Sequence, residues 1–573
     1  MATAKRWVSK PQPDIDQIDF LCAEIKVPRP LAAILIQRGI TTYDQAKQFF
    51  RPQLSDLPDP FLMKDMDKAV ARLNKAINEG EKILVYGDYD VDGTTSVALM
   101  YSYLHAFYPN LDYYIPDRNL EGYGISTKGV DFARDNGFSL IVALDCGIKS
   151  LDKVDYANQS GIDFIICDHH IPGDVLPAAA AVLDPKRADC EYPFKELSGC
   201  GIGFKLIQAH AQAAGKSFDE VLGFIQLVAV SIASDLVSIS GENRILAYFG
   251  IRQLRESPMP GLKAILDCYV QKEDYSVSDL VFGLGPRINA AGRLADAKLA
   301  VRVMISDNPL DASLLAKSLN EHNEDRKFFD QDITKQALLM VAEHDFPGRR
   351  SNVLFHKEWH KGVIGIVASR VIEKYYRPTV VLTESNGVAV GSARSVSGFD
   401  LYKALQQCND VLLQFGGHQF AAGMTLELSR VEEFQKKFEE VVAASIEERS
   451  LLPEIEYDYE LNFADITPKF FSVLKQMEPF GPDNMKPIFM TTGVVDAGGS
   501  RAVGANSQHL KLTVFQRKDS KNIVDGIGFG MGEYQGAVKG GKSIDICYTL
   551  EENTFRDLTT IQLNLKDLKL SEE

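Results

Sequence analysis

The sequence has few of the features that mark secreted or membrane-bound chains. Its eight cysteines are scattered without a Cys-x-x-Cys pair, which predicts reduced thiols and not a disulfide framework. No apolar run reaches the roughly 20 residues that a membrane-spanning helix needs. The segment Met1–Trp7 lacks a signal-peptide core, and no repeat or low-complexity stretch follows. We therefore expect a globular, cytoplasmic protein with no membrane partner.

Positive charge is also in short supply, because 78 Asp and Glu against 62 Lys and Arg give a net charge of −16. This deficit argues at first against a nucleic-acid partner, since phosphate binding usually leaves a basic footprint. A metal centre built from carboxylates would account for part of the negative charge, and a basic channel can exist locally on an acidic protein. The charge argues against indiscriminate coating of duplex DNA. It does not decide whether the protein binds single strands.

The chain is long enough for three or four domains, with 573 residues of which 45% are hydrophobic. From Lys82 to about Ser240, buried-strand runs alternate with helical stretches such as 94–107 and 149–160. This alternation predicts an α/β domain with a doubly wound parallel sheet.

The most distinctive segment is Tyr86-Gly-Asp-Tyr-Asp-Val-Asp-Gly93, directly after the apolar run 83–85. Residues that follow such strands lie in the crevice where open α/β sheets bind ligands. Asp88, Asp90 and Asp92 would repel one another there and raise each other's pKa unless cations lie among them. The segment therefore predicts a metal site.

Further candidate ligands each follow an apolar run, namely Asp145, the triplet Asp168-His169-His170, and Asp235. Any one of them could be structural, for example Asp145 as a helix N-cap. Several such clusters within one domain favour a shared site, and carboxylates mixed with imidazole suit Mn²⁺ or Mg²⁺ better than zinc. The glycine-rich stretch Gly199–Gly203 could seat a phosphate at a helix start, although a close-packing turn is the more frequent role.

Taken in order, these motifs resemble the DHH phosphoesterase superfamily, whose members use a two-metal centre. Gly416-Gly-His-Gln-Phe-Ala-Ala-Gly423 resembles the signature of its accessory DHHA1 domain. The segments Leu284–Arg293 and Trp359–Arg370 resemble the RecJ family of single-strand-specific 5′ to 3′ DNA exonucleases. The likeness runs from about residue 80 to the C-terminus.

Two segments depart from the family pattern. Ser231-Ile-Ala-Ser precedes Asp235 where the family has a Gly-Thr pair, so Asp235 is assigned by its position. The segment Glu478–Met485 ends in Asn-Met where the family has Asn-Pro, a change that we expect to affect a loop and not the chemistry.

The resemblance implies that two Mn²⁺ or Mg²⁺ ions generate a hydroxide for in-line displacement at phosphorus. Asp145 and Asp235 are candidates for shared ligands, and Asp168 for orienting a neighbouring ligand. His170 could stabilise charge or protonate the leaving oxygen. The predicted metal ligands are Asp88, Asp90, Asp92, Asp145, His169 and Asp235, and the predicted catalytic residues are Asp145, His169, His170, Asp235 and His418.

Substrate contacts are predicted at several further positions. Ser392 and Arg394 stand two apart after a strand, where a hydroxyl and a guanidinium could hold one phosphate, although a solvated pair has the same spacing. The resemblance implies that this pair and Arg118 recognise a 5′-terminal phosphate. The full predicted set is Arg118, Arg287, Arg293, Ser392, Arg394, Gly416, Gly417 and His418, in which the glycines would admit the DNA backbone.

We expect five regions along the chain. Residues 1–75 form an N-terminal extension that packs on the DHH catalytic domain of residues 76–255. A helical linker region (256–348) contains a long bridging helix over 311–344, in which apolar positions recur at helical spacing. The DHHA1 domain spans 349–452. Short alternating strands over 453–573 predict an OB-type β-barrel that binds single strands or serves only for packing.

Three classes of function agree with these motifs. The leading one is a metal-dependent exonuclease that degrades single-stranded DNA to 5′-mononucleotides in repair and recombination. Another DHH phosphoesterase, such as a short-oligonucleotide hydrolase or a pyrophosphatase, would have little use for a barrel, and a non-enzymatic relative would have lost ligands. The residues do not show whether the substrate is DNA or RNA. A monomer is expected, and a single-strand-binding protein and a helicase are partners that the resemblance implies.

Overall fold

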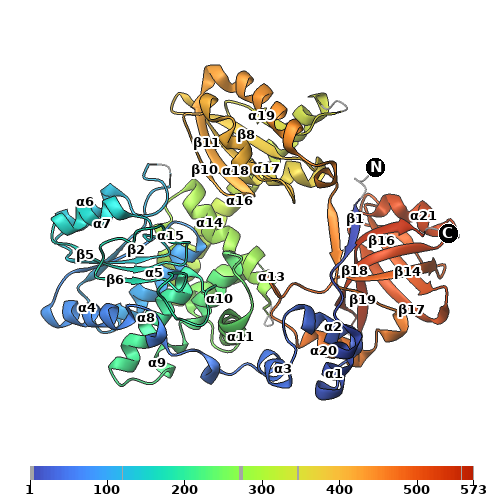
Figure 1. Ribbon diagram of the computed structural model, residues 1–573, viewed down its shortest axis with the longest axis horizontal. Helices are drawn as coiled ribbons and strands as arrows, with labels where there is room; N and C mark the ends of the chain where they lie inside the picture. The colour runs from blue at the N-terminus through green and yellow to red at the C-terminus, as the bar shows by residue number, and fades with distance from the viewer. Residues whose placement is uncertain (1–4, 119, 270–274, 345–347, 557, 572–573) are drawn as a thin grey trace. The chain divides into compact units, whose positions relative to one another are not determined.

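The computed structural model describes residues 5–118, 120–269, 275–344, 348–556 and 558–571 (Figure 1). The chain forms two compact units. We call residues 51–327 with 479–485 the parallel-sheet unit, and the remainder the mixed-sheet unit. The long helix α16 (Pro309–His344) begins in the first unit and ends in the second, which confirms the helix expected over 311–344. Its 36 residues span about 54 Å.

A five-stranded sheet forms the centre of the parallel-sheet unit. Its strands lie in the order β3-β2-β4-β5-β6, and every neighbouring pair is parallel. The doubly wound arrangement expected from the sequence is therefore present. The bounds are β2 (Ile83–Gly87), β3 (Leu111–Tyr114), β4 (Leu140–Leu144), β5 (Asp163–Cys167) and β6 (Ala181–Leu183).

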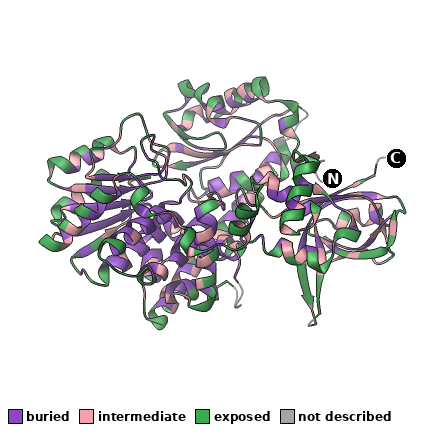
Figure 2. Ribbon diagram, turned by 60° about the horizontal axis from the view of Figure 1, so that its bottom comes forward, coloured by how far each residue is buried: buried purple, intermediate pink, exposed green. Residues whose placement is uncertain are grey.

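Helices cover both faces of this sheet, because alternate strand residues point to opposite sides. Ile83 and Val85 join the larger core on one face, whereas Leu84 and Tyr86 join a second core on the other. Figure 2 shows the strands buried between helices whose outer sides are exposed. The larger core packs against α4 (Met66–Glu79), α5 (Val91–His105), α8 (Gly199–Ala213) and α10 (Ile225–Ser234), and the second against α6 (Thr127–Asp135) and α7 (Leu151–Gln159).

The parallel-sheet unit extends beyond residue 255, the boundary predicted for the catalytic domain. Apolar residues of the helices that follow, such as Leu262, Ile288 and Val301, belong to the same core as the sheet. Residues 256–327 are therefore part of this unit and not a separate linker region, because each short helix buries its apolar face there. These helices include α12 (Pro260–Asp267), α14 (Gly285–Leu294) and α15 (Lys298–Met304), and α11 (Gly241–Glu256) precedes them.

The mixed-sheet unit contains a five-stranded sheet in the order β10-β11-β9-β8-β7, in which only β7 and β8 are parallel. One face packs against α17 (Ile364–Lys374) and the end of α16, and the other against α18 (Leu401–Gln406) and α19 (Val431–Ser445). The strands are β7 (Asn352–Phe355), β8 (Thr379–Ser385), β9 (Val388–Arg394), β10 (Gln414–Gly417) and β11 (Ala421–Glu427).

The C-terminal strands pair in a closed ring. β14 pairs with both β16 and β18, β16 with β17, β17 with β19, and β19 with β18. This connectivity is the one expected for the predicted OB-type fold. The strands are β14 (Phe489–Asp496), β16 (His509–Gln516), β17 (Asp519–Gly528), β18 (Ile544–Phe555) and β19 (Leu558–Leu570).

The N-terminal segment corrects one prediction. Strand β1 (Arg6–Ser9) pairs in parallel with β12 (Glu454–Tyr457), and Lys10 Nζ lies 2.8 Å from Asp458 Oδ1. Helices α1 (Ile15–Ile25), α2 (Arg29–Gln37) and α3 (Tyr43–Phe50) belong to the same unit. Only residues 51–75 of the expected extension belong to the parallel-sheet unit. The backbone of β1 instead pairs with β12, a distant strand that no local sequence pattern identifies.

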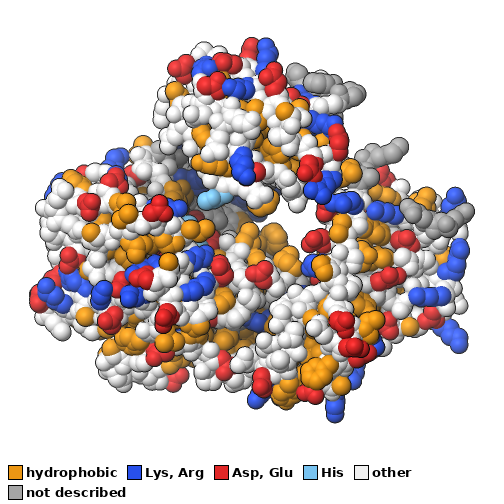
Figure 3. Space-filling model, in the orientation of Figure 1, with side chains coloured by type: hydrophobic (Ala, Val, Ile, Leu, Met, Phe, Trp, Pro, Cys, Tyr) orange, Lys and Arg blue, Asp and Glu red, His pale blue; other side chains and the backbone are white. Residues whose placement is uncertain are grey.

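Charges of both signs lie on the face of the molecule drawn in Figure 3. Figure 3 shows Lys and Arg side chains interspersed with Asp and Glu on the face in view. Within the described ranges, no helix is both long and apolar enough to cross a membrane.

Candidate metal centre

The predicted ligands converge because the ends of adjacent parallel strands share one edge of the sheet. β2 lies between β3 and β4, so the strand order reverses beside it, which is where open α/β sheets bind ligands. Asp88 follows β2, Asp145 follows β4, and Asp168 and His169 follow β5. Asp235 joins them from the C-terminal end of α10.

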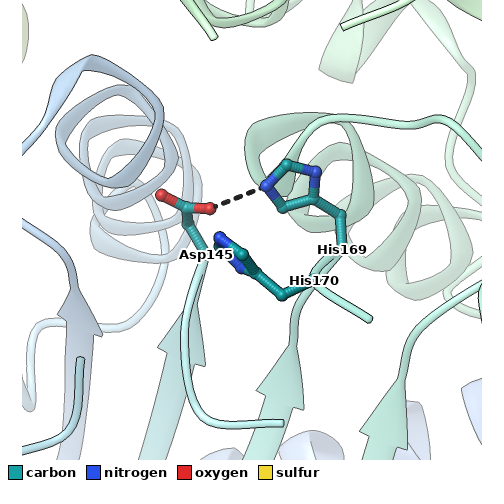
Figure 4. Close-up of side chains that lie close together, drawn as sticks. All are labelled: Asp145, His169 and His170. Atoms are coloured by element: carbon teal, nitrogen blue, oxygen red, sulfur yellow. Dashed lines mark ion pairs between the residues drawn. The ribbon is translucent and has the colours of Figure 1, made fainter. Parts of the chain in front are cut away.

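His169 is at the centre of this cluster. Its Nε2 lies 3.2 Å from Asp145 Oδ1, 3.6 Å from Asp235 Oδ2 and 3.8 Å from Asp92 Oδ2. Figure 4 shows Asp145 and His169 facing each other from neighbouring strand ends, with His170 beside them. Two groups of possible ligands, Asp145-His169-His170 and Asp92-His169-Asp235, share His169, and the ligand atoms of each group lie within 4.8 Å of one another.

Asp145 is held in an unusual backbone conformation. Its φ of 59° lies in the left-handed region, which residues with a Cβ seldom adopt. Its backbone N–H donates to Cys167 O at 2.8 Å, which joins the ends of β4 and β5. A backbone strained in this way at a buried carboxylate is typical of functional sites, where the surrounding structure must maintain it.

Asp92 is fixed by the start of α8. Its carboxylate accepts the backbone N–H groups of Gly199 at 2.7 Å and Cys200 at 2.8 Å, and the hydroxyl of Ser231 at 2.7 Å. The positive end of a helix stabilises a carboxylate in this position. The glycine-rich stretch therefore holds a carboxylate of the centre, and the alternative of a phosphate seat at this helix start is not supported.

The carboxylates are crowded enough to need cations. Burial, and then repulsion from Asp92 and Asp90, raises the pKa of Asp145 well above its usual range. Burial and a neighbouring aspartate raise the pKa of Asp88 and of Asp235 to about 8. Asp88 Oδ2 is buried without a hydrogen-bond partner among the described residues. Oxygen-rich ligands with one imidazole fit a divalent ion such as Mn²⁺ or Mg²⁺.

Asp168 has a different environment from the other aspartates. It accepts the backbone N–H groups of Ile148 at 2.9 Å and His169 at 2.8 Å, and its Oδ1 lies 2.7 Å from His170 Nδ1. Although burial opposes it, these bonds hold the pKa of Asp168 below its usual range. This geometry agrees with the orienting role predicted for Asp168. His170 Nε2 in turn lies 3.0 Å from the Tyr123 hydroxyl.

A cavity of about 280 Å³ lies beside the carboxylates, and two of the predicted arginines also line it. Arg118 and Arg293 line it, and the Arg118 guanidinium lies 5.0 Å from the centroid of the Tyr89 ring. Positive groups thus face the carboxylate cluster across one cavity. Its other lining residues are Asp88, Tyr89, Asp90, Val91, Asp92, Tyr123, Ser234, Asp235 and Asn289.

Sequence reasoning missed several of these neighbours. Tyr123 and Asn289 lie in the same segments as Arg118 and Arg293, and that proximity was the only signal available for them. Asp184 follows β6 and is fully buried, and burial raises its pKa to about 7. It follows an apolar run as the other aspartates do, so the same pattern could have found it.

Arg287, a predicted substrate contact, is buried in the core. It is 4% exposed, and its guanidinium donates to Asn320 Oδ1 at 2.8 Å, Gly283 O at 2.8 Å and Cys268 O at 3.1 Å. It is not one of the described residues that line the cavity. Arg287 therefore joins helices and loops of the core, and its contact with substrate stays a prediction.

The remaining predicted contacts form a second cluster, in the mixed-sheet unit. Arg394 Nη1 donates to Ser392 Oγ at 3.0 Å. A Cβ at Gly365, in the first turn of α17, would lie 2.9 Å from that hydroxyl and 3.0 Å from Arg394 Nη2, so only glycine lets the helix start approach both groups. A hydroxyl, a guanidinium and a helix N-terminus together suit a phosphate.

The glycine-rich signature lies at the same end of this sheet. Ala421 pairs with Arg394, and Gly417 pairs with Ala422 with a φ of 148°. His418 is exposed in the turn between β10 and β11, where its backbone N–H donates to Ala421 O at 2.8 Å. Gly416, Gly417 and His418 are thus grouped near Arg394.

A parallel sheet with this carboxylate and imidazole centre, joined by a long helix to a mixed sheet, is the architecture of a DHH-type phosphoesterase. Three family models match the chain in that order. They describe the DHH family N-terminal domain at residues 82–232, the DHHA1 domain at 350–444 and the RecJ OB domain at 457–567.

Relatives match nearly the whole chain. The single-stranded-DNA-specific exonuclease RecJ of Bacillus subtilis is 36% identical over 100% of this chain and 72% of that protein. RecJ of Escherichia coli is 33% identical over 98% of this chain and 99% of that protein. The crystal structure of RecJ from Thermus thermophilus in complex with Mn²⁺ superposes with a TM-score of 0.83 at 26% identity, covering 99% and 80% of the two chains. The same protein has also been solved with Mg²⁺. The chain belongs to the RecJ family of DHH phosphoesterases.

Proposed function

We propose that this protein is a metal-dependent exonuclease that hydrolyses single-stranded DNA from the 5′ end and releases 5′-mononucleotides, in DNA repair and recombination. The observation that carries this proposal is the buried cluster around His169, which opens into a cavity shared by carboxylates and two arginines. Relatives named for this activity at 33% to 36% identity support the choice of substrate.

Different residues of the chain would bind the metal ions and the phosphate groups of the strand. Two ions of Mn²⁺ or Mg²⁺, held by Asp88, Asp90, Asp92, Asp145, His169 and Asp235, would supply the activated water and offset charge at phosphorus. Arg118 and Arg293 face the same cavity, where their N–H groups can bind the phosphate oxygens of the strand.

His170 is the candidate proton donor to the leaving oxygen. Although burial opposes it, the hydrogen bond with Asp168 raises the pKa of His170 above its usual value, so the ring carries a proton more readily near neutral pH. Asp168 fixes one ring nitrogen, and the Tyr123 hydroxyl contacts the other. The ring is thereby held at the edge of the centre.

End recognition is proposed for the cluster around Arg394. A 5′-terminal phosphate carries more charge than an internal phosphodiester, and Ser392, Arg394 and the start of α17 offer it a hydroxyl, a guanidinium and helix N–H groups. Gly416, Gly417 and His418 would contact the adjacent backbone. Binding of the terminal phosphate would place the first phosphodiester for cleavage.

The experiment compares single strands of DNA and RNA, labelled at either end and incubated with Mn²⁺. We expect labelled mononucleotide to appear at once from 5′-labelled DNA, while 3′-labelled DNA shortens stepwise. Asp145→Asn serves as the inactive control. Equal degradation of RNA, or release of the 3′ label first, would contradict the proposal. Action as a cytoplasmic monomer, and contacts with a single-strand-binding protein and a helicase, remain predictions from the sequence.

A further inference from the structure

The mixed-sheet unit has a second cavity, of about 540 Å³, that none of the roles above uses. One wall is a face of α16 with Phe328, Phe329 and Gln336, and the opposite wall is the loop that carries His356, Trp359 and His360. The volume is within the range of pockets that hold small organic ligands.

Aromatic rings dominate both walls. The rings of Phe329 and His360 are stacked, with centroids 5.4 Å apart and planes 17° from parallel, and those of His356 and Trp359 are stacked at 5.5 Å and 26°. Phe328 is 68% exposed, although burial of an aromatic side chain is energetically favourable. The cavity thus has flat apolar walls, and the exposed ring of Phe328 lies at its edge.

The walls are held in place by hydrogen bonds. Trp359 Nε1–H donates to Gln336 Oε1 at 2.9 Å, which joins the loop to α16. The Thr383 hydroxyl donates to Trp359 O at 2.6 Å, which joins the loop to β8. A cavity fixed from two sides needs little reorganisation to receive a planar ligand, so binding costs less entropy.

The polar groups at the rim suit a base with phosphates outside. His360 Nδ1 accepts the Gly362 N–H at 3.1 Å, so the proton of the neutral ring is on Nε2 and available for donation. Lys357 is exposed and Lys361 half-buried, and both line the cavity. The carboxylates of Asp332 and Glu384 also line the cavity, and they would repel a phosphate while accepting the amino groups of a base.

We propose that this cavity binds one nucleobase of the single-stranded substrate, stacked against Phe328 and the Phe329–His360 pair, with Lys357 and Lys361 on the flanking phosphates. Stacking suits an exonuclease that must accept any sequence, because every base has a flat face. The inference rests on the proposed function, since it assumes that the substrate is a single strand.

Phe328→Ala tests the stacking contact, because the exposed side chain can be removed without opening the core. Binding of a 20-residue oligo(dT) is measured by fluorescence anisotropy in the full-length Asp145→Asn background, which prevents hydrolysis, beside the same strand with abasic sites in place of its bases. We expect Phe328→Ala to weaken binding of oligo(dT) about 5-fold or more, in line with the usual effect of losing a base–aromatic stack. Binding of the abasic strand should change less than about 2-fold.

The matched control is Leu339→Ala, which removes another exposed apolar side chain, 56% exposed, from the same helix. Leu339 is not among the described residues that line the cavity, so its variant should bind both strands as the parent does. Equal binding of oligo(dT) by Phe328→Ala and its parent would overturn the inference. An equal loss on both strands would also overturn it, because it would assign the residue to the phosphate backbone.

Trp359 provides an independent readout, since the chain has two tryptophans. In Trp7→Phe, Trp359 is the remaining fluorophore, and oligo(dT) should quench it whereas the abasic strand should not. Unchanged fluorescence at saturating oligo(dT) would show that no base enters. Binding is also measured at several salt concentrations, and log K is plotted against log salt. Replacing Lys357 and Lys361 with alanine should reduce the magnitude of the slope by about 1.4, since each phosphate contact on a single strand contributes about 0.7.

Failure of this inference can be told from failure of the proposed function. If the wild-type enzyme degrades oligo(dT) while Phe328→Ala binds it unchanged, only the base site is wrong. If the wild-type enzyme degrades no single strand in Mn²⁺, the exonuclease assignment itself fails.

Discussion

Gly199 lies so close to Asp145 that a Cβ added at residue 199 would be 2.6 Å from the Cβ of Asp145. Asp145 cannot easily retreat, because its backbone already has a φ of 59° and its N–H is bonded to Cys167. The start of α8 and the end of β4 therefore have to approach without a side chain between them. The backbone N–H of Gly199 also donates a hydrogen bond to the carboxylate of Asp92. Two predicted metal ligands therefore depend on this glycine.

The first prediction is that Gly199→Ala lowers the rate of hydrolysis by about 10²-fold or more, because displacements near 1 Å at a catalytic group commonly cost that much. Mn²⁺ affinity, measured by calorimetry, should fall as well. Gly201→Ala is the control in the same turn, since its Cβ would lie at an ordinary 3.4 Å from Leu197 and Ser198. Equal activity of the two variants would contradict the role given to this contact.

Neutralising one carboxylate should separate metal binding from folding. Asp235→Asn removes repulsion with Asp92 and Asp90, which together with burial raises the pKa of Asp235 to about 8. We expect the metal-free variant to melt at a higher temperature than the metal-free wild type, and to lose most of the increase in Tm that Mn²⁺ produces. Asp174→Asn, an exposed aspartate, has the same change in charge and should show neither effect. A lower Tm for metal-free Asp235→Asn would argue against crowding.

The end-recognition proposal predicts a difference between substrates. Arg394→Ala should slow cleavage of 5′-phosphorylated strands about 10-fold or more relative to 5′-hydroxyl strands, since a charge-assisted hydrogen bond contributes about 1.5 to 3 kcal/mol. The ratio of kcat/KM for the two strands is the measurement. Arg449→Ala removes an arginine of the same unit that is 71% exposed and should leave the ratio unchanged. If Arg394→Ala slows both strands by one factor, the arginine binds the backbone generally.

A buried histidine away from the centre predicts a pH effect on stability. His210 Nε2 donates to Asn74 Oδ1 at 3.1 Å, and its Nδ1 lies 2.7 Å from the Tyr103 hydroxyl, so the neutral ring can use both of its nitrogens. Burial, and then Lys216, lowers the pKa of His210. The unfolded chain, with a pKa of about 6.5 at this residue, therefore takes up a proton first as the pH falls.

The contribution of His210 to stability should accordingly be present above pH 6.5 and decline below it, by up to about 1.4 kcal/mol per pH unit. His210→Gln should cost most at pH 7.5, and its cost should shrink towards pH 5. The two proteins are compared by thermal unfolding across this range. A cost that stays constant with pH would show that the ring is not kept neutral.

The sequence was enough to group the candidate metal ligands, because the ends of adjacent parallel strands converge at one edge of the sheet, whatever the loops do. Asp145, His169 and Asp235 could therefore be grouped from separate motifs. Tyr123 and Asn289 could not, since neither charge nor a strand pattern distinguishes them from solvated loop residues. The buried position of Arg287 could not be predicted either, because an arginine in a motif can bind buried carbonyl oxygens as readily as a substrate phosphate. The pairing of β1 with β12 depends on residues far apart in the chain, which local patterns do not encode.

That pairing also sets an order of events during synthesis. Arg6 and Glu454 are 448 positions apart, so the first strand emerges from the ribosome long before its partner exists. The residues of the parallel-sheet unit up to 327 are made in between and can begin to fold as the chain grows. Strand β1 must wait for β12 until then. A ribosome stalled before residue 454 would therefore carry a nascent chain in which the backbone of β1 has no partner strand.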